Sequence, residues 1–298
     1  MRKHLLPILF LIAAGAIWWA SISSTLRNPV ADNNNPVVVV SGYVPYTLTK
    51  QLAGDTVNVI MLLPPGAEPH AFEPTPGSLV SMKYADAFIY LSDELEPWAK
   101  DLAQSAGEKT RILPLTKALP AAEDPHVWMN PQQAQLMAYQ IGALLAKIAP
   151  QNRSVTDANY FKLADELDQL DQDFKTALAN CQSREVVHIG HLAFKNLTDT
   201  YGLTLTALAG TSHEGEHSAQ KLAELIQKIQ AKHISTIFTE DMLSPRLAQT
   251  VAQETDTLIL PLYPIEHISK DDFNQNITYS TLMRRNLDSL VRGLQCKA

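Results

Sequence analysis

A long amphipathic helix near the middle of the chain constrains the possible folds more than any other feature of the sequence. Between about Val155 and Asn180, apolar residues recur at spacings of four, three, four and four, with polar residues between them: Leu163, Leu167, Leu170, Phe174 and Leu178. This spacing gathers them on one face of a helix. The pattern predicts a single rigid helix that separates the sequence before it from the sequence after it.

Strand-like and helix-like segments alternate on both sides of this helix. The runs VVVV, VNVIMLL and DAFIYL come before it, and EVVHI, LTLTAL, STIFTE and TLILPL come after it. Such alternation is typical of parallel sheets covered by helices. We therefore predict an α/β fold of two lobes, each a mainly parallel sheet flanked by helices, joined by the long helix. The expected boundaries are 37–151 for the N-terminal lobe, 152–181 for the connecting helix and 182–298 for the C-terminal lobe.

The N-terminus has the pattern of an export signal. The basic sequence MRKH precedes an apolar run from Leu5 to about Ala20, which is the order of regions in a secretory signal. We expect residues 1–24 to be a signal peptide or an uncleaved N-terminal anchor, followed by a polar linker over 25–36. In an oxidising compartment, Cys181 and Cys296 form a disulfide more readily than a metal site.

Composition excludes one class of partner. The net charge is −7 and the sequence contains no basic run, so we expect no nucleic-acid partner.

Three histidines are the strongest candidates for a functional site. His70 lies in PPGAEPHAFEPTP, His126 in DPHVWMNP and His191 in VVHIGHLAF, and the first and last of these follow predicted strands. In open α/β sheets, ligands bind beyond the carboxyl ends of the strands. Three neutral imidazoles suit Zn²⁺, which accepts histidine nitrogens in a tetrahedral arrangement. The sequence therefore predicts a zinc site in the cleft between the two lobes, whereas His188, inside the strand, is expected to be a core residue.

The order of these motifs resembles the zinc-type solute-binding proteins of bacterial metal-uptake ABC transporters. The resemblance rests on PGAEPHAFEPTP, DPHVWMNP, HLAF with YGL, IFTE and YSTLMRRNLDSL, and it runs from about Val37 to Leu294. It implies a periplasmic receptor, not an enzyme, that carries Zn²⁺ as its transported ligand on His70, His126 and His191. In manganese-type relatives the third position is typically a glutamate, so an imidazole there favours zinc. The implied partner is an ABC permease, with membrane contact through that permease or an uncleaved N-terminal segment, and the protein is expected to be a monomer.

The sequence departs from this family at the fourth ligand. Zinc-type relatives usually carry an aspartate in a Leu-Asp-Pro segment after the last strand, whereas this chain has LPLYPIEH, with Tyr263 at that place. A phenol is a poor zinc ligand because its unperturbed pKa is about 10. Water, Tyr263, Glu240, Glu266 and His267 are the alternatives, and we take Glu240, at the end of STIFTE, as the expected fourth donor.

Other roles stay open. The same fold could serve a manganese or iron receptor or an adhesin-like metal-binding protein. Three histidines with an open fourth position also describe a zinc hydrolase with Glu240 as base, although the chain shows no HExxH helix, because Gly215 disfavours a helix across HEGEH at 213–217. A further polar cluster could be a second metal-capture site, a source of the fourth ligand or a mobile loop: His213, Glu214, Glu216 and His217.

Overall fold

The computed structural model describes residues 35–119, 124–209, 219–240 and 245–297. The expected signal or anchor, most of the linker and the polar cluster at 213–217 lie outside the described residues. Among the helices that are described, none is long and apolar enough to cross a membrane.

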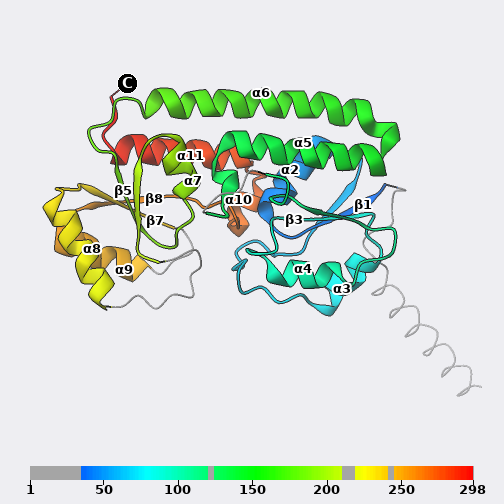
Figure 1. The fold of residues 1–298 in the computed structure, drawn as a ribbon, viewed down its shortest axis with the longest axis horizontal. Coiled ribbons are helices and arrows are strands. Elements are labelled where there is room, and N and C mark those ends of the chain that lie inside the picture. The colour runs from blue at the N-terminus through cyan, green and yellow to red at the C-terminus, as the bar shows by residue number, and fades with distance from the viewer. Residues whose placement is uncertain (1–34, 120–123, 210–218, 241–244, 298) are drawn as a thin grey trace, which may run out of the picture. The chain divides into compact units, whose positions relative to one another are not determined.

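The N-terminal lobe is built on a sheet of four parallel strands in the order β2-β1-β3-β4 (Figure 1). The strands are β1 (Val37–Val40), β2 (Asn58–Met61), β3 (Ala87–Tyr90) and β4 (Arg111–Pro114). Every residue of β1 and β3 is buried, because helices cover both faces of the sheet. Figure 1 shows α2 and α5 on one face and α3 and α4 on the other. These helices are α2 (Tyr43–Ala53), α3 (Pro76–Lys83), α4 (Pro97–Ala103) and α5 (Pro131–Ile148).

The C-terminal lobe repeats this topology. Its four parallel strands have the order β6-β5-β7-β8 and are β5 (Glu185–Ile189), β6 (Thr204–Ala207), β7 (Thr236–Thr239) and β8 (Leu258–Pro261). The helices that follow β5 are α7 (Lys195–Thr200), α8 (Ala219–Ala231), α9 (Pro245–Thr255), α10 (Lys270–Asn274) and α11 (Tyr279–Gly293). Two parallel sheets flanked by helices confirm the predicted fold class.

The long helix is α6 (Arg153–Ala177), and it packs against α5, α2 and α11 (Figure 1). The predicted apolar face is the buried one: Leu163, Leu167, Leu170 and Phe174. One continuous hydrophobic core contains residues of both sheets, such as Val38 and Val186, together with this face of α6. The helix is therefore part of a core that the two lobes share.

A disulfide links the segment after α6 to the C-terminal end of the chain. Cys181 follows α6 and Cys296 follows α11, and their sulfurs are bonded across a sequence separation of 115 residues. The predicted disulfide is thus confirmed.

Strand order fixes where a ligand can bind. In the N-terminal sheet the chain order reverses between β1 and β3, and in the C-terminal sheet it reverses between β5 and β7. Ligands of open α/β sheets bind beyond the carboxyl ends of strands at such reversals. The loops that leave these strand ends are therefore the first place to look for a site.

Candidate metal centre

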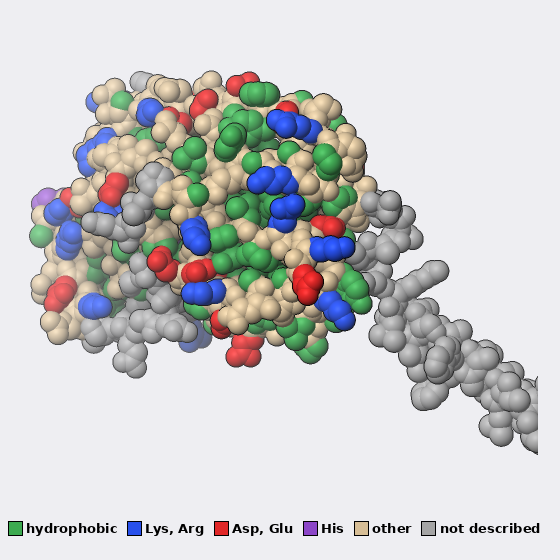
Figure 2. All heavy atoms as spheres, turned by 45° about the vertical axis from the view of Figure 1, so that its right-hand side comes forward, with side chains coloured by type: hydrophobic (Ala, Val, Ile, Leu, Met, Phe, Trp, Pro, Cys, Tyr) green, Lys and Arg blue, Asp and Glu red, His purple; other side chains and the backbone are tan. Residues whose placement is uncertain are grey.

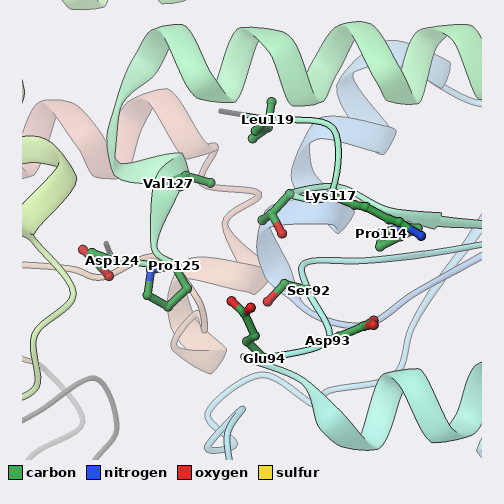
Figure 3. A pocket seen from close by; sticks show the side chains of 10 residues that line it. Ser92, Asp93, Glu94, Pro114, Lys117, Leu119, Asp124, Pro125 and Val127 are labelled. Carbon is green, nitrogen blue, oxygen red and sulfur yellow. The ribbon is translucent and has the colours of Figure 1, made fainter. Parts of the chain in front are cut away.

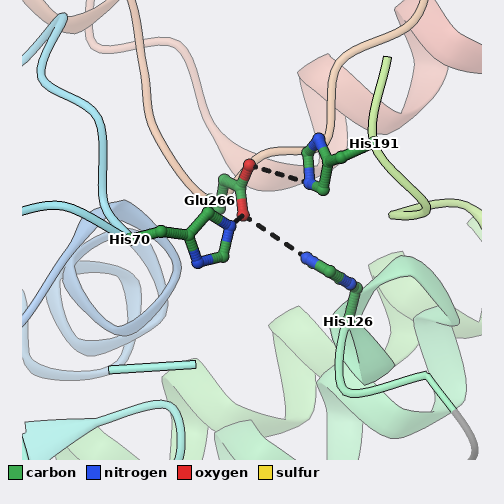
Figure 4. A group of neighbouring side chains, drawn as sticks. All are labelled: His70, His126, His191 and Glu266. Carbon is green, nitrogen blue, oxygen red and sulfur yellow. Dashed lines mark ion pairs between the residues drawn. The ribbon is translucent and has the colours of Figure 1, made fainter. Parts of the chain in front are cut away.

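Four side chains from four loops that follow strands meet at one point (Figure 4). His70 follows β2, His126 follows β4, His191 follows β5 and Glu266 follows β8. One donor atom from each lies within 4.8 Å of the others, a spacing that could hold a metal ion. The three predicted histidines therefore converge, and the carboxylate that joins them is Glu266.

The imidazoles point their Nε2 atoms at the Glu266 carboxylate. Nε2 of His70 lies 3.2 Å from Oε2, Nε2 of His126 lies 3.5 Å from Oε2, and Nε2 of His191 lies 3.2 Å from Oε1. The side chains of His126 and His191 are fully buried and that of His70 is 11% exposed. The cluster is thus almost completely withdrawn from water, with His70 as its most exposed member.

His126 is held by the residues on both sides of it. Asp124 Oδ1 accepts hydrogen bonds from the backbone N–H of His126 at 3.1 Å and from its Nδ1 at 2.6 Å. A short 3-10 helix, Val127–Met129, then leads into α5, where Asn130 Oδ1 accepts the N–H of Gln132 at 2.8 Å, as a helix cap does. Because Nδ1 is engaged, Nε2 is the nitrogen left to face the cluster.

His191 is held in the same way by Glu240. Glu240 Oε1 accepts hydrogen bonds from the backbone N–H of His191 at 3.0 Å and from its Nδ1 at 2.8 Å. His188 adds a contact of 3.1 Å between its Nδ1 and the carbonyl of His191. A Cβ on Gly190 would lie only 2.2 Å from Glu240 Oε1, so only glycine leaves room for this carboxylate.

This geometry gives Glu240 a different position from the one expected from the sequence. Glu240 lies on the Nδ1 side of His191, and Glu266 lies on the Nε2 side with the other two histidines. Sequence reasoning named Glu266 only as an alternative. The sequence signal that could have identified Glu266 as a donor is its place in LPLYPIEH, three residues after the expected aspartate position.

Tyr263 contacts Arg285 and Asn286 of α11. Its backbone N–H donates to Asn286 Oδ1 at 2.7 Å, its carbonyl accepts from Asn286 Nδ2 at 2.8 Å, and its ring lies 5.9 Å from the Arg285 guanidinium. These contacts fix the start of the segment that carries Glu266.

Burial and charge shift the pKa values of the cluster in opposite directions. Burial alone would lower the pKa of each histidine, but the neighbouring carboxylates outweigh it. The pKa values of His70 and His126 are raised, and that of His191 is raised to about 10 by Glu240 and Glu266. Burial would raise the pKa of Glu266, but the three imidazoles hold it well below its ordinary value. Without a metal, the cluster therefore favours protonated imidazoles around an ionised carboxylate.

A further buried carboxylate, that of Glu96, lies at the ends of β1 and β3. Glu96 is 2% exposed, and its Oε2 accepts hydrogen bonds from the backbone N–H of Leu91 at 2.6 Å and from Ser41 Oγ at 3.0 Å. Burial raises the pKa of Glu96 to about 7. Glu96 thus links the ends of β1 and β3, and it interacts electrostatically with His70 and Glu266 of the cluster.

A separate pocket of about 360 Å³ lies next to Asp124 (Figure 3). Its polar lining comes from the loop after β3, including Asp93 and Glu94, and from the segment after β4, including Lys117. None of the four clustered donors lines it.

The outer surface carries charges of both signs. Figure 2 shows lysine and arginine side chains interspersed with aspartate and glutamate on one face, with hydrophobic side chains between them. This face therefore lacks the broad field of positive charge that phosphate-backbone binding uses.

The fold and the four donors define a two-lobed α/β metal-binding protein. Residues 38–293 match the family described as ZnuA, the periplasmic component A of the zinc-uptake complex. The chain belongs to this family, whose members are binding components of uptake systems rather than enzymes.

Curated relatives agree with this assignment. The high-affinity zinc uptake system protein ZnuA of Bacillus subtilis is 29% identical over 313 residues, which cover 97% of this chain and 98% of that protein. The zinc-binding lipoprotein AdcA of Streptococcus pneumoniae is 30% identical over 274 residues, which cover 85% of this chain. The match covers only 54% of AdcA, so the chain spans about half the length of that relative.

Solved structures show the same fold. The laminin-binding protein Lmb of Streptococcus agalactiae, described as an adhesin with metal-transporting activity, superposes with a TM-score of 0.80 at 30% identity over 87% of this chain and 100% of that chain. The Zn(II)-bound ZnuA-like domain of S. pneumoniae AdcA gives a TM-score of 0.77 at 30% identity over 88% and 99%. A manganese-bound periplasmic metal-binding protein from Candidatus Liberibacter asiaticus, at 22% identity and a TM-score of 0.79 over 87% and 100%, shows likeness of fold alone.

Proposed function

We propose that this protein is an extracytoplasmic high-affinity receptor for Zn²⁺ and that His70, His126, His191 and Glu266 bind the ion. The observation that carries the proposal is the convergence of three imidazoles and one carboxylate within 4.8 Å. Zinc in a closed protein site is four-coordinate, and histidine nitrogen and carboxylate oxygen are among its usual donors. One carboxylate also offsets half of the charge that three neutral imidazoles would leave on the ion.

The two orienting carboxylates support the same assignment. Asp124 and Glu240 each bind the Nδ1 of a histidine whose Nε2 faces the cluster. This is the usual arrangement around metal-bound histidines, where the outer carboxylate fixes the tautomer and makes the imidazole a stronger donor. We therefore assign Glu240 to the orientation of His191 and not to direct coordination.

The donor set favours a receptor over the alternatives. Four protein donors close a tetrahedral site, whereas a zinc hydrolase keeps one position open for water. Three imidazoles suit zinc better than manganese, which prefers oxygen donors. Membership of a zinc-uptake family supports delivery of the ion to an ABC permease outside the cytoplasm, in the periplasm.

Competition titration of the purified protein against a zinc chelator tests the donor set. Glu266→Gln should weaken zinc binding by more than about a hundredfold, beyond the usual range for the loss of an orienting group. Glu240→Gln should weaken it by about tenfold to a hundredfold. Glu73→Gln, which changes an exposed carboxylate in the His70 loop, is the matched control and should bind as wild type. Wild-type affinity in Glu266→Gln would exclude Glu266 from the site.

Delivery requires a cellular test. A strain lacking this gene should fail to grow when zinc is scarce, and the wild-type gene should restore growth. The Glu266→Gln gene should not restore it. Restoration by a variant that binds no zinc would contradict the receptor role.

A further inference from the structure

Trp128 connects two of the proposed donors that are far apart in the sequence. It lies two residues after His126, is fully buried, and packs its ring edge-on to the His126 ring with centroids 5.2 Å apart. A buried indole N–H needs an acceptor. The Nε1 of Trp128 donates to the carbonyl of Pro264 at 2.7 Å, and this proline lies two residues before Glu266.

After Tyr263, which α11 holds, the segment 264–268 carries Glu266 away from the C-terminal sheet and is held by hydrogen bonds from the N-terminal lobe. Besides the bond to Trp128, the N–H of Gly66 donates to the carbonyl of Ile268 at 2.8 Å. The carbonyl of Glu266 also approaches Gly42, at the end of β1, where an added Cβ would lie 3.5 Å from it. Hydrogen bonds from the N-terminal lobe therefore hold the chain before and after Glu266, and Gly42 packs close to Glu266 itself.

The backbone between Pro264 and Glu266 is unusual. Ile265 is 1% exposed and has a φ of 65°, in the left-handed region that β-branched residues avoid. A residue stays in such a conformation only where its surroundings determine it. The fixed carbonyl of Pro264 is one such constraint, and the sharp turn at Ile265 then directs Glu266 into the cluster.

We propose that Trp128 is the positioning residue for the fourth donor. Through its hydrogen bond to Pro264 it holds Glu266 at a fixed spacing from His126, so that Glu266 stays with the N-terminal lobe although it follows the last strand of the C-terminal sheet. His191, held by Glu240 and His188, is then the donor that follows the C-terminal sheet. This inference rests on the proposed zinc site. It adds the residue that fixes the position of one donor, Glu266.

Trp98 supplies a matched control within the chain. Its Nε1 donates to the carbonyl of Pro69 at 3.0 Å, directly before His70, and its ring packs against Phe72. The same change, tryptophan to phenylalanine, removes an indole N–H at both positions but acts on different donors.

A double-mutant cycle tests the proposal, with zinc affinity measured by chelator competition. Trp128→Phe should weaken binding by about tenfold in the wild type, as loss of an outer partner does. In the Glu266→Gln background the same change should cost less than about threefold, because the donor it positions is gone. Trp98→Phe should cost the same factor in both backgrounds, because His70 is present in both.

The outcomes separate the two proposals. An equal loss from Trp128→Phe in both backgrounds would show a general structural role and overturn the positioning role. Wild-type affinity in Glu266→Gln alone would remove Glu266 from the site, and the positioning role with it. A reduced loss in the double variant supports both proposals.

If the Trp128→Phe variant does not fold, hydrogen exchange in the wild-type protein tests the proposal instead. The indole N–H of Trp128, assigned through its contacts with His126 and Pro264, should be protected from hydrogen exchange to the same degree with and without zinc. Rapid exchange in the zinc-free protein would show that the bond to Pro264 does not hold the segment before the ion arrives, which contradicts the proposal.

Discussion

Two histidines of the proposed site are each paired with a buried carboxylate. Asp124 engages His126, and Glu240 engages His191, in both cases through the backbone N–H and the Nδ1 of the same residue. Each pair fixes the ring orientation and the tautomer, which is why both Nε2 atoms face one point.

The first prediction concerns Asp124. Changing Asp124 to Asn keeps the size of the side chain but removes the charge that engages Nδ1 of His126. Zinc affinity should fall by about tenfold, measured by chelator competition. Asp101→Asn, an exposed change on α4, should leave affinity unchanged. Equal affinities of Asp124→Asn and wild type would contradict the orienting role of Asp124.

The second prediction concerns pH. The pKa values of His70, His126 and His191 are raised in the zinc-free protein, that of His191 to about 10. Near pH 7 the imidazole of His191 holds a proton that zinc must displace, and the raised pKa values of the other two act in the same direction, so zinc affinity should rise with pH and binding should release protons. Calorimetry in buffers of different ionisation enthalpy measures that release. Binding without proton release at pH 7 would contradict histidine ligation.

The contribution of these histidines to the stability of the zinc-free protein should depend on pH in the opposite direction, because it decreases as the pH rises. A histidine with a raised pKa stabilises the fold fully below its unfolded pKa of about 6.5 and loses that contribution as the pH rises through the folded pKa. For His191 this window extends to about pH 10. Glu266, whose pKa is lowered, contributes stability that is lost as the pH falls through its folded pKa.

The sequence could predict the three histidines but not the choice between two carboxylates. Each histidine lies in a distinctive motif, whereas Glu240 and Glu266 both follow strands of the same sheet. What separates them is the left-handed turn at Ile265 and the bond from Trp128 to Pro264 across 136 residues. No local pattern indicates that an isoleucine will adopt such a turn.

Among the elements, α6 shows most clearly how a sequence pattern becomes packing. Phe174 is fully buried within the shared core, whereas Phe161 on the same helix is 66% exposed. The apolar periodicity predicted which face would be buried. It could not predict the short 3-10 helix after His126, because a segment of three residues is too short to show an apolar periodicity.

The third prediction uses these two phenylalanines. Phe174→Ala should destabilise the protein by about 3–5 kcal/mol, because it leaves a cavity in the core. Phe161→Ala should change stability by less than about 0.5 kcal/mol. Urea denaturation of both variants measures the difference, and similar losses would contradict the burial of this face.

For the whole molecule, the lobes are not independent bodies, because one hydrophobic core crosses from the first sheet to the second. The alternation of strands and helices was enough to predict two parallel sheets. It could not predict that the segment after β8 returns to contact the N-terminal lobe, since that depends on contacts between residues far apart in the sequence.

The fourth prediction concerns the disulfide. Changing Cys181 and Cys296 together to Ser should lower the free energy of unfolding by about 2–5 kcal/mol, because a long loop is no longer closed in the unfolded chain. Cys181 precedes β5 and Cys296 follows α11, whereas the donors follow the carboxyl ends of strands, so zinc affinity should stay unchanged. A large loss of zinc affinity in a folded double variant would show that the disulfide shapes the site.

Anomalous diffraction from crystals of the zinc-loaded protein, recorded on both sides of the zinc absorption edge, tests the central claim most directly. We predict one peak at bonding distance, about 2.0–2.2 Å, from the Nε2 atoms of His70, His126 and His191 and from an oxygen of Glu266. A peak that Glu240 or Tyr263 coordinates in place of Glu266, or a peak away from the three histidines, would contradict the account.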